Sequence, residues 1–445
     1  MDITPRLGLR TVGGYNDPEA THIHDPLHAR SLVLDDGQTR LVFVIADNVG
    51  IDQVVFDTAG KLIKEETGIP PARVLMAATH THTAVSAGGE GDRRRGYNKG
   101  KPLDEYQQFL VRRIADGVRI AINNLEPARI GWGAGSVPQH VFNRRWKLKN
   151  PVRNPFGQLD AVQFNPGVSN TNKLEPAGGT DPEVAFFSVQ SIEGRPIALL
   201  ANYSLHYVGG VPAGHISADY FALFSNKIAA QLAKDNKMPP FVGFMTNGTS
   251  GDVNNIDFSK AGPSYAPYEK MDLVAEDVAQ EVLRVYKSIG YQNHVALKSA
   301  RSDLSLKVRK PSLEIYERSK KVRDSPPDTK FDHRLERIFA NRVIQIYETW
   351  PDEIPVPLQV FRIGDLAIRG IPFEVFAETG LDLKKKSRFQ RSFTISFANG
   401  SYAYLPTPAQ HKLGGYETWL AASKVEETAS EKITHELMKL EESLK

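Results

Sequence analysis

Two histidines two residues apart, His80 and His82, directly follow a short apolar run at residues 74–78. Successive side chains of an extended chain point to opposite sides, so both rings would lie on one face. Neutral imidazole is the commonest metal-ligating side chain and also carries protons near neutral pH. The pattern therefore predicts that both histidines bind a metal, that both act in acid–base catalysis, or that one histidine has each role, at the end of a strand. The alternative is a pair of solvated loop histidines.

A second apolar stretch, residues 197–205, also ends in a histidine, His206, and glycines follow it. This repeats the first arrangement, in which an apolar strand delivers a histidine into a glycine-containing loop. We therefore expect His206 to join His80 at one site. His22 and His24 have the same spacing as the first pair, but no strongly apolar strand leads into them. We interpret them as surface or supporting histidines.

Several acidic residues could serve a metal site or only the fold. Asp47 follows a predicted strand, where it is either a metal-site carboxylate or the N-cap of the next helix. Asp252 lies in a glycine-containing segment and could orient a histidine or form an ordinary turn. Glu374 and Glu378 are four residues apart and would share one face if a helix started at Pro372. One of these two glutamates is then a candidate ligand.

Two arginine-rich segments could contact a substrate. Arg144 and Arg145 stand beside Trp146, where they could hold a substrate oxyanion or lie on a surface turn. Residues 90–102 form a polar segment with three consecutive arginines, 93–95. This segment is long enough to act as a lid beside the histidines, although a solvated loop explains it as well.

The order of elements predicts an α/β protein. A strand at 41–46, a helix at 52–66 and a strand at 74–78 give the strand–helix–strand alternation of this class. We expect layered mixed β-sheets flanked by helices in a single large catalytic domain, residues 1–445. The most charged part, about 300–353, is expected to be a helical excursion from the core, with helices near 312–322 and 334–349.

Composition excludes several functions. There are 55 basic and 52 acidic side chains, so the charge balance gives no reason to expect a nucleic acid partner. Cysteine is absent, which excludes thiol catalysis and thiolate metal sites. No apolar run approaches the roughly 18 residues of a membrane span. The N-terminus is not a basic segment followed by an apolar one, so a periplasmic or secreted location would require that a signal peptide had been removed. The sequence indicates no particular oligomeric state.

A series of short motifs, taken in order, resembles the catalytic domain of the neutral/alkaline non-lysosomal ceramidase family, nearly end to end. The motifs are Asp2-Ile3-Thr4-Pro5, Ala78-Thr79-His80-Thr81-His82-Thr83, Asn143-Arg144, the strand before His206, Gly251-Asp252-Val253, Pro372-Phe373-Glu374 and the segment around Tyr404. Each motif is weak by itself, and their common order makes the resemblance specific.

The resemblance implies a zinc-dependent amidohydrolase that cleaves an N-acyl bond with a zinc-activated water. It implies that one Zn²⁺ is held by His80, His206, Glu374 and Tyr404, a set of nitrogen and oxygen ligands that zinc accepts. It further implies that His82 handles protons or the developing oxyanion. Arg144 would hold a substrate oxygen, and Asp252 would be the orienting carboxylate.

The chain also departs from the family pattern. The family continues Gly-Asp-Val-Ser-Pro-Asn, whereas Asn254 stands at the serine position here. A mechanism that needs this hydroxyl is unavailable, while a zinc–water mechanism remains and Asn254 can still donate a hydrogen bond. We expect no C-terminal immunoglobulin-like domain and find no obvious apolar segment for gripping a bilayer. The expected substrate is therefore a small-molecule or lipid-like N-acyl compound, and one more soluble than ceramide is plausible.

Two other classes of function fit parts of the sequence. The first is a phosphoesterase with two metals, in which Asp47, Asp219 or Asp252 would be additional ligands. The second is a non-catalytic binding protein that has kept the fold and lost the reaction, in line with Asn254. Metal content per chain separates the first from a ceramidase-type site, and turnover of an amide separates the second.

Overall fold

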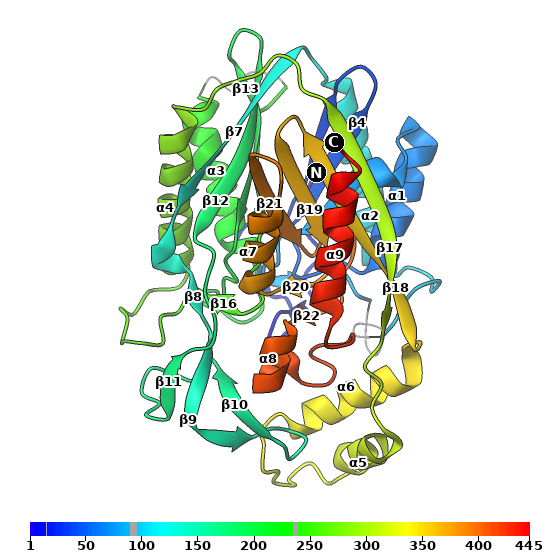
Figure 1. Cartoon of the computed structure of the whole chain (residues 1–445), viewed down its shortest axis with the longest axis vertical. Coiled ribbons are helices and arrows are strands. Elements are labelled where there is room, and N and C mark those ends of the chain that lie inside the picture. The colour runs from blue at the N-terminus through cyan, green and yellow to red at the C-terminus, as the bar shows by residue number, and fades with distance from the viewer. Residues whose placement is uncertain (15, 90–95, 235–238) are drawn as a thin grey trace.

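Three mixed β-sheets form the framework of the computed structural model, which describes residues 1–14, 16–89, 96–234 and 239–445. Each sheet combines antiparallel pairs with one parallel pair at an edge, and Figure 1 shows their arrangement. The strands of the three sheets, in spatial order, are β3 (Ala29–Asp35), β4 (Arg40–Ala46) and β5 (Val74–Ala78); β15 (Val242–Asn247), β13 (Pro196–Tyr203), β12 (Glu183–Ser191) and β7 (Ala128–Ser136); and β17 (Leu297–Lys307), β18 (Glu353–Ile363), β19 (Leu366–Ile371) and β21 (Arg391–Ser396).

The three sheets share one hydrophobic core. Phe43 from β4, Phe187 from β12 and Phe361 from β18 belong to a single cluster of buried side chains. Because the cluster draws on residues far apart in the sequence, the sheets fold as one unit. This is the layered α/β organisation that the sequence predicts.

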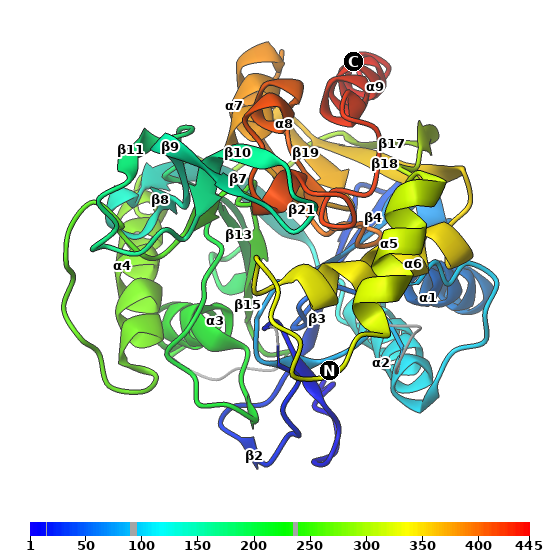
Figure 2. The same ribbon diagram turned by 90° about the horizontal axis from the view of Figure 1, so that it is seen from below.

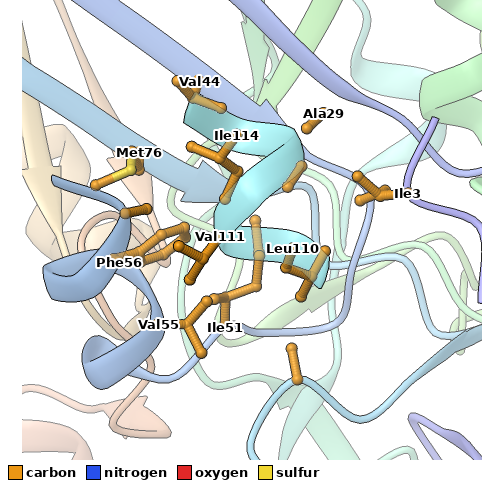
Figure 3. Packing of buried hydrophobic residues seen from close by; sticks show 14 of the residues in the cluster. Ile3, Ala29, Val44, Ile51, Val55, Phe56, Met76, Leu110, Val111 and Ile114 are labelled. Atoms are coloured by element: carbon orange, nitrogen blue, oxygen red, sulfur yellow. The ribbon is translucent and has the colours of Figure 1, made fainter. Parts of the chain in front are cut away.

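Helices cover the outer faces of the sheets. Strand β4 is apolar on both faces. Phe43 belongs to the shared core, whereas Val44 belongs to the cluster that contains Phe56 and Ile114 of the covering helices, as Figure 3 shows. Figure 2 shows the helices on different sides of the sheets. Helices α1 (Gln53–Thr67) and α2 (Glu105–Asn123) cover the first sheet, α3 (Asp219–Leu232) and α4 (Glu269–Tyr286) the second, and α7 (Ala377–Lys386) and α9 (Ala429–Glu442) the third.

The charged segment contains two helices, α5 (Leu313–Arg323) and α6 (Glu336–Thr349), which pack together at the lower end of Figure 1. The predicted start of this excursion at 300 is wrong, because residues up to 307 form β17 and pair with β18. Asp303, Ser305 and Lys307 are exposed on one face of β17, which explains the polar composition of this strand.

The remaining strands and helix α8 lie outside these three sheets. They are β1 (Thr11–Val12), β2 (His22–Ile23), β6 (Ala84–Val85), β8 (Phe142–Asn143), β9 (Arg145–Arg153), β10 (Leu159–Phe164), β11 (Lys173–Pro176), β14 (His215–Ile216), β16 (Val253–Asn254), β20 (Glu374–Val375), β22 (Tyr404–Leu405) and α8 (Pro408–Leu413). Two of their pairings, β20 with β22 and β8 with β16, position the site described below.

Two expectations about helix ends are wrong. The residue that caps α1 is Asp52, which accepts a hydrogen bond from the Val54 amide, and not Asp47. The helix expected from Pro372 begins at Ala377, so Glu374 belongs to β20 and does not share a helix face with Glu378. Within the described ranges, no helix is both long and apolar enough to cross a membrane.

Candidate metal centre

His80 and His82 follow β5, and backbone contacts fix the segment that carries them. The amide of His80 donates to the carbonyl of Asn48, at 2.8 Å, so the chain stays beside the end of β4. His80 has a φ of 74°, a left-handed conformation that costs a non-glycine residue roughly 1–3 kcal/mol. The two rings thus converge as the sequence predicts, although the chain between them is not a regular strand.

Three histidine rings meet at one point. Nε2 of His82 lies 3.1 Å from Nε2 of His80 and 2.8 Å from Nε2 of His206. One nitrogen of each ring lies within 4.8 Å of the others, so the group could hold a metal ion. His80 and His206 are buried, whereas His82 is half-buried.

Backbone carbonyls set the tautomers of two of these rings. Nδ1 of His80 lies 2.5 Å from the carbonyl of Val49, and Nδ1 of His82 lies 2.8 Å from the carbonyl of Gly13. A carbonyl accepts only, so each Nδ1 carries the proton and each Nε2 keeps a lone pair for a ligand. Burial lowers the pKa of both rings, that of His82 to about 4, so both are neutral at neutral pH.

Glu374 reaches the same point from β20, and Tyr404 lies beside it in β22. They are direct partners in the parallel pairing of β20 with β22. Oε2 of Glu374 lies 3.7 Å from Nε2 of His80 and 3.9 Å from Nδ1 of His206. It is buried and has no hydrogen-bond partner among the described residues, which is a costly state for a carboxylate oxygen. Burial raises the pKa of Glu374 to about 7, while the Arg144 charge and a hydrogen bond from Tyr404 oppose that rise.

The lack of a side chain at Gly251 allows the backbone there to pass close to the backbone of Glu374. A Cβ atom at Gly251 would lie 2.4 Å from the carbonyl oxygen of Glu374, so only glycine fits beside β20. The glycine therefore serves a close contact between two backbone segments of the chain.

Arg144 lies behind the histidines, where it is 4% exposed. Its guanidinium donates to Nδ1 of His206 at 3.2 Å, to the carbonyl of Gly251 at 3.0 Å and to Glu417 at 2.8 Å. Its Cζ also lies 5.4 Å from the centre of the Tyr404 ring. These contacts differ from the predicted contact with a substrate oxygen, because they direct Arg144 towards the residues that surround the metal site.

Asp252 and Asn254 have structural partners. The carboxylate of Asp252 accepts from the side chain of Asn143 at 2.9 Å and from the amide of Ala377 at 2.8 Å. It contacts no histidine within the described part of the chain, contrary to the prediction that it orients one. Asn254 is fully buried and its amide donates to Asn165 at 2.9 Å.

The aspartates of the two-metal alternative lie outside the histidine group. Oδ2 of Asp47 accepts from Arg30 at 2.7 Å and from the amide of His28 at 2.9 Å. Asp219 is buried, and its Oδ1 atom, like Oδ1 of Asp47, has no hydrogen-bond partner among the described residues. In the described ranges, the residue group able to hold a metal consists of the three histidines and no aspartate.

A pocket with a volume of about 260 Å³ opens onto the centre. His80, His82, Glu374 and Tyr404 line its inner end, whereas His206, Arg144, Asp252 and Asn254 do not line it. Residues 96–99 line its rim; residues 90–95, which hold the arginine triplet of the predicted lid, lie outside the described part of the chain.

Sequence reasoning missed three residues around this site. Glu417 pairs with Arg144 from a buried position, and Lys424 and Arg342 line the pocket. None of the three stands at the end of an apolar strand or within a recurring spacing, so no local signal marks them.

The fold and the site define an α/β protein with a buried, metal-competent histidine cluster at the base of a pocket. Residues 1–260 match the family described as neutral/alkaline non-lysosomal ceramidase, N-terminal. Because that match covers more than half of the chain, the protein belongs to this family, whose members are ceramide-type amidohydrolases.

Solved structures show the same fold. The neutral ceramidase from Pseudomonas aeruginosa matches with a TM-score of 0.73 and 16% identity over 100% of this chain and 73% of that chain. A structure described as a ceramidase complexed with C2 matches with a TM-score of 0.73 and 16% identity over 100% of this chain and 74% of that chain.

Proposed function

We propose that this protein is a zinc-dependent amidohydrolase that cleaves an N-acyl amide bond. The observation that supports this most directly is the convergence of His80, His206 and Glu374 at the buried end of a pocket that His82 also lines. Family membership supports the reaction class.

The residues present fit zinc. Two imidazoles, the Glu374 carboxylate and the Tyr404 phenol form a nitrogen and oxygen donor set that zinc accepts. The Glu374 oxygen that lacks a hydrogen-bond partner supports the same assignment, because a cation would satisfy it. When bound, zinc would act as a Lewis acid towards the amide carbonyl and lower the pKa of water.

The chain's own residues would move the protons. The Nε2 lone pair of His82 can accept a proton from the attacking water, because Gly13 holds the proton of this ring on Nδ1. As the C–N bond breaks, the same nitrogen can return that proton to the leaving amine. Arg144 would position His206 and Tyr404 through its contacts with both.

The size and lining of the pocket support a substrate smaller and more polar than ceramide. Its volume of about 260 Å³ is at the low end for a ligand pocket, and its wall contains Lys99, Arg342 and Lys424. A long-chain lipid would need a larger apolar surface. We therefore propose a more soluble N-acyl compound as the substrate.

Two alanine variants test the assignment of roles. His206→Ala should lose both zinc and amide hydrolysis, because it removes a ligand. His82→Ala should keep zinc and lose about 100-fold or more in kcat, the usual contribution of a positioned acid–base group. Metal content and amine release are measured on the same samples. Full activity with retained zinc in His206→Ala would overturn the ligand assignment, and zinc loss in His82→Ala would make His82 a ligand.

A further inference from the structure

Helix α6 builds part of the wall of the pocket. Arg342, Gln345 and Ile346 line the pocket together, and their spacing of three and four places them on one face of the helix. Trp350, directly after α6, lines it as well. One face of α6 therefore borders the same pocket as His80, His82 and Glu374.

Arg342 is a cation on this wall that forms no ion pair with a carboxylate of the described residues. Its Nε–H group is buried and donates to no acceptor among them. Its Cζ lies 4.7 Å from the centre of the Phe339 ring, which holds the group in place. A buried, unpaired N–H group is costly to a fold, so its presence in a pocket calls for a ligand.

Arg342 is connected to the metal centre by aromatic rings. Phe339 contacts Tyr416 with ring centres 5.8 Å apart, and Tyr416 contacts Tyr404 at the same distance. These residues belong to one buried cluster. The guanidinium thus has a fixed position relative to Tyr404, as a specificity contact requires.

The other charges of the pocket also favour an anion. Lys424 lines it beside Trp350, with Nζ 4.5 Å from the ring centre, and Lys99 stands at the rim. Two carboxylates are among the described lining residues: Asp52 caps α1 and Glu374 faces the histidines. Three cationic side chains, those of Lys99, Arg342 and Lys424, line the same pocket.

We propose that the substrate carries an anionic group and that Arg342 binds it. This inference rests on the proposed amidohydrolase function. We place the anion on the amine half, as in an N-acyl amino acid whose acyl chain is a simple hydrocarbon. Arg342 is then a substrate-binding residue that sets specificity, because a guanidinium matches the two oxygens of a carboxylate, and equally those of a sulfonate or phosphate.

Matched substrates test this inference. The probes share one acyl chain: N-hexanoylglycine, N-hexanoyltaurine, N-hexanoyl-O-phosphoethanolamine and the neutral N-hexanoylethanolamine. Release of the amine gives kcat/KM for each. The protein should prefer at least one anionic probe to the neutral one by about 10- to 100-fold, and the three anions show which oxyanion fits.

Variants locate the preference. Arg342→Met should reduce the ratio of anionic to neutral kcat/KM by about 10- to 100-fold, mainly through KM, and Arg342→Lys should restore part of it. Arg334→Met removes an equal charge from an exposed position just before α6, outside the pocket, and should leave the ratio unchanged. A preference for the neutral probe, or an unchanged ratio in Arg342→Met, would overturn the inference.

Binding separates this inference from the proposed function. If no probe is hydrolysed, the amidohydrolase proposal fails, and calorimetry with N-hexanoylglycine still tests the anion site. Binding that is lost in Arg342→Met and kept in Arg334→Met would support the site, whereas binding that is equal in the two variants, or absent from the unmodified protein, would refute it.

Discussion

The buried carboxylate of Glu417 holds two arginines beside the candidate metal centre, and the size of the effect of its removal can be calculated. Glu417 accepts from Nε of Arg144 at 2.8 Å and from Nη1 of Arg145 at 2.6 Å. The side chains are at most 4% exposed. Glu417→Gln keeps the shape and removes the charge, so two buried guanidinium groups lose their counter-ion.

Breaking a buried ion pair from one side costs about 3–5 kcal/mol. Unfolding entropy scales with chain length, so for 445 residues each kcal/mol corresponds to about 1 °C in Tm. Glu417→Gln should therefore lower Tm by about 3–5 °C. Because Arg144 also contacts His206, the rate of amide hydrolysis should fall by about tenfold or more, while zinc stays bound.

The matched control is Glu66→Gln. Glu66 pairs with Arg112 through two hydrogen bonds of 2.6 and 2.8 Å, but these side chains are 24% and 40% exposed. Such a solvent-screened pair contributes little to stability, so Tm should change by about 1 °C or less. Thermal unfolding at one scan rate compares both variants with the unmodified protein. Equal Tm changes in the two variants would refute the reasoning that Glu417 fixes the arginines.

Two further perturbations test the geometry of the centre. Glu374 has a folded-state pKa of about 7 against an ordinary 4.5, so the metal-free protein should lose stability as pH rises from 4.5 to about 7, whereas bound zinc favours the ionised carboxylate. The Tm difference between zinc-loaded and metal-free protein should therefore widen over this range, and a constant difference would contradict the raised pKa. Gly13→Ala would place a Cβ atom 2.5 Å from the carbonyl oxygen of His82 at a φ of 123°, and should displace the His82 ring. Activity should fall with zinc retained, and unchanged kinetics would show that Gly13 does not hold His82.

Local patterns in the sequence were sufficient for the framework of the fold. Strand β4 reads as apolar on both faces, and both faces are buried, one against helices and the other against the shared core. The same kind of pattern placed His80 and His206 at strand ends, where the structure brings their rings together. Each strand end is recognisable from its own local pattern, whereas the contact between the two histidines joins strands of different sheets and depends on the tertiary structure.

The remainder of the site depends on pairs far apart in sequence. Glu374 was expected on a helix face, but it pairs with Tyr404 across β20 and β22, and no local period reveals such a pairing. Arg144 and Glu417 are separated by 273 residues. Asp252 resembles a histidine partner in sequence, yet it binds the amide of Ala377 and the side chain of Asn143. The tertiary structure alone decides these roles.

The most direct test of the proposed zinc site is the metal content per chain of the purified protein and of Glu374→Ala. The proposed site predicts one zinc per chain, lost or greatly weakened in Glu374→Ala because the variant removes a ligand. The Arg334→Met protein serves as the control that keeps its zinc. Two metals per chain would contradict the single-zinc site and favour a phosphoesterase, and a protein that binds no zinc even after incubation with it would contradict metal-dependent hydrolysis.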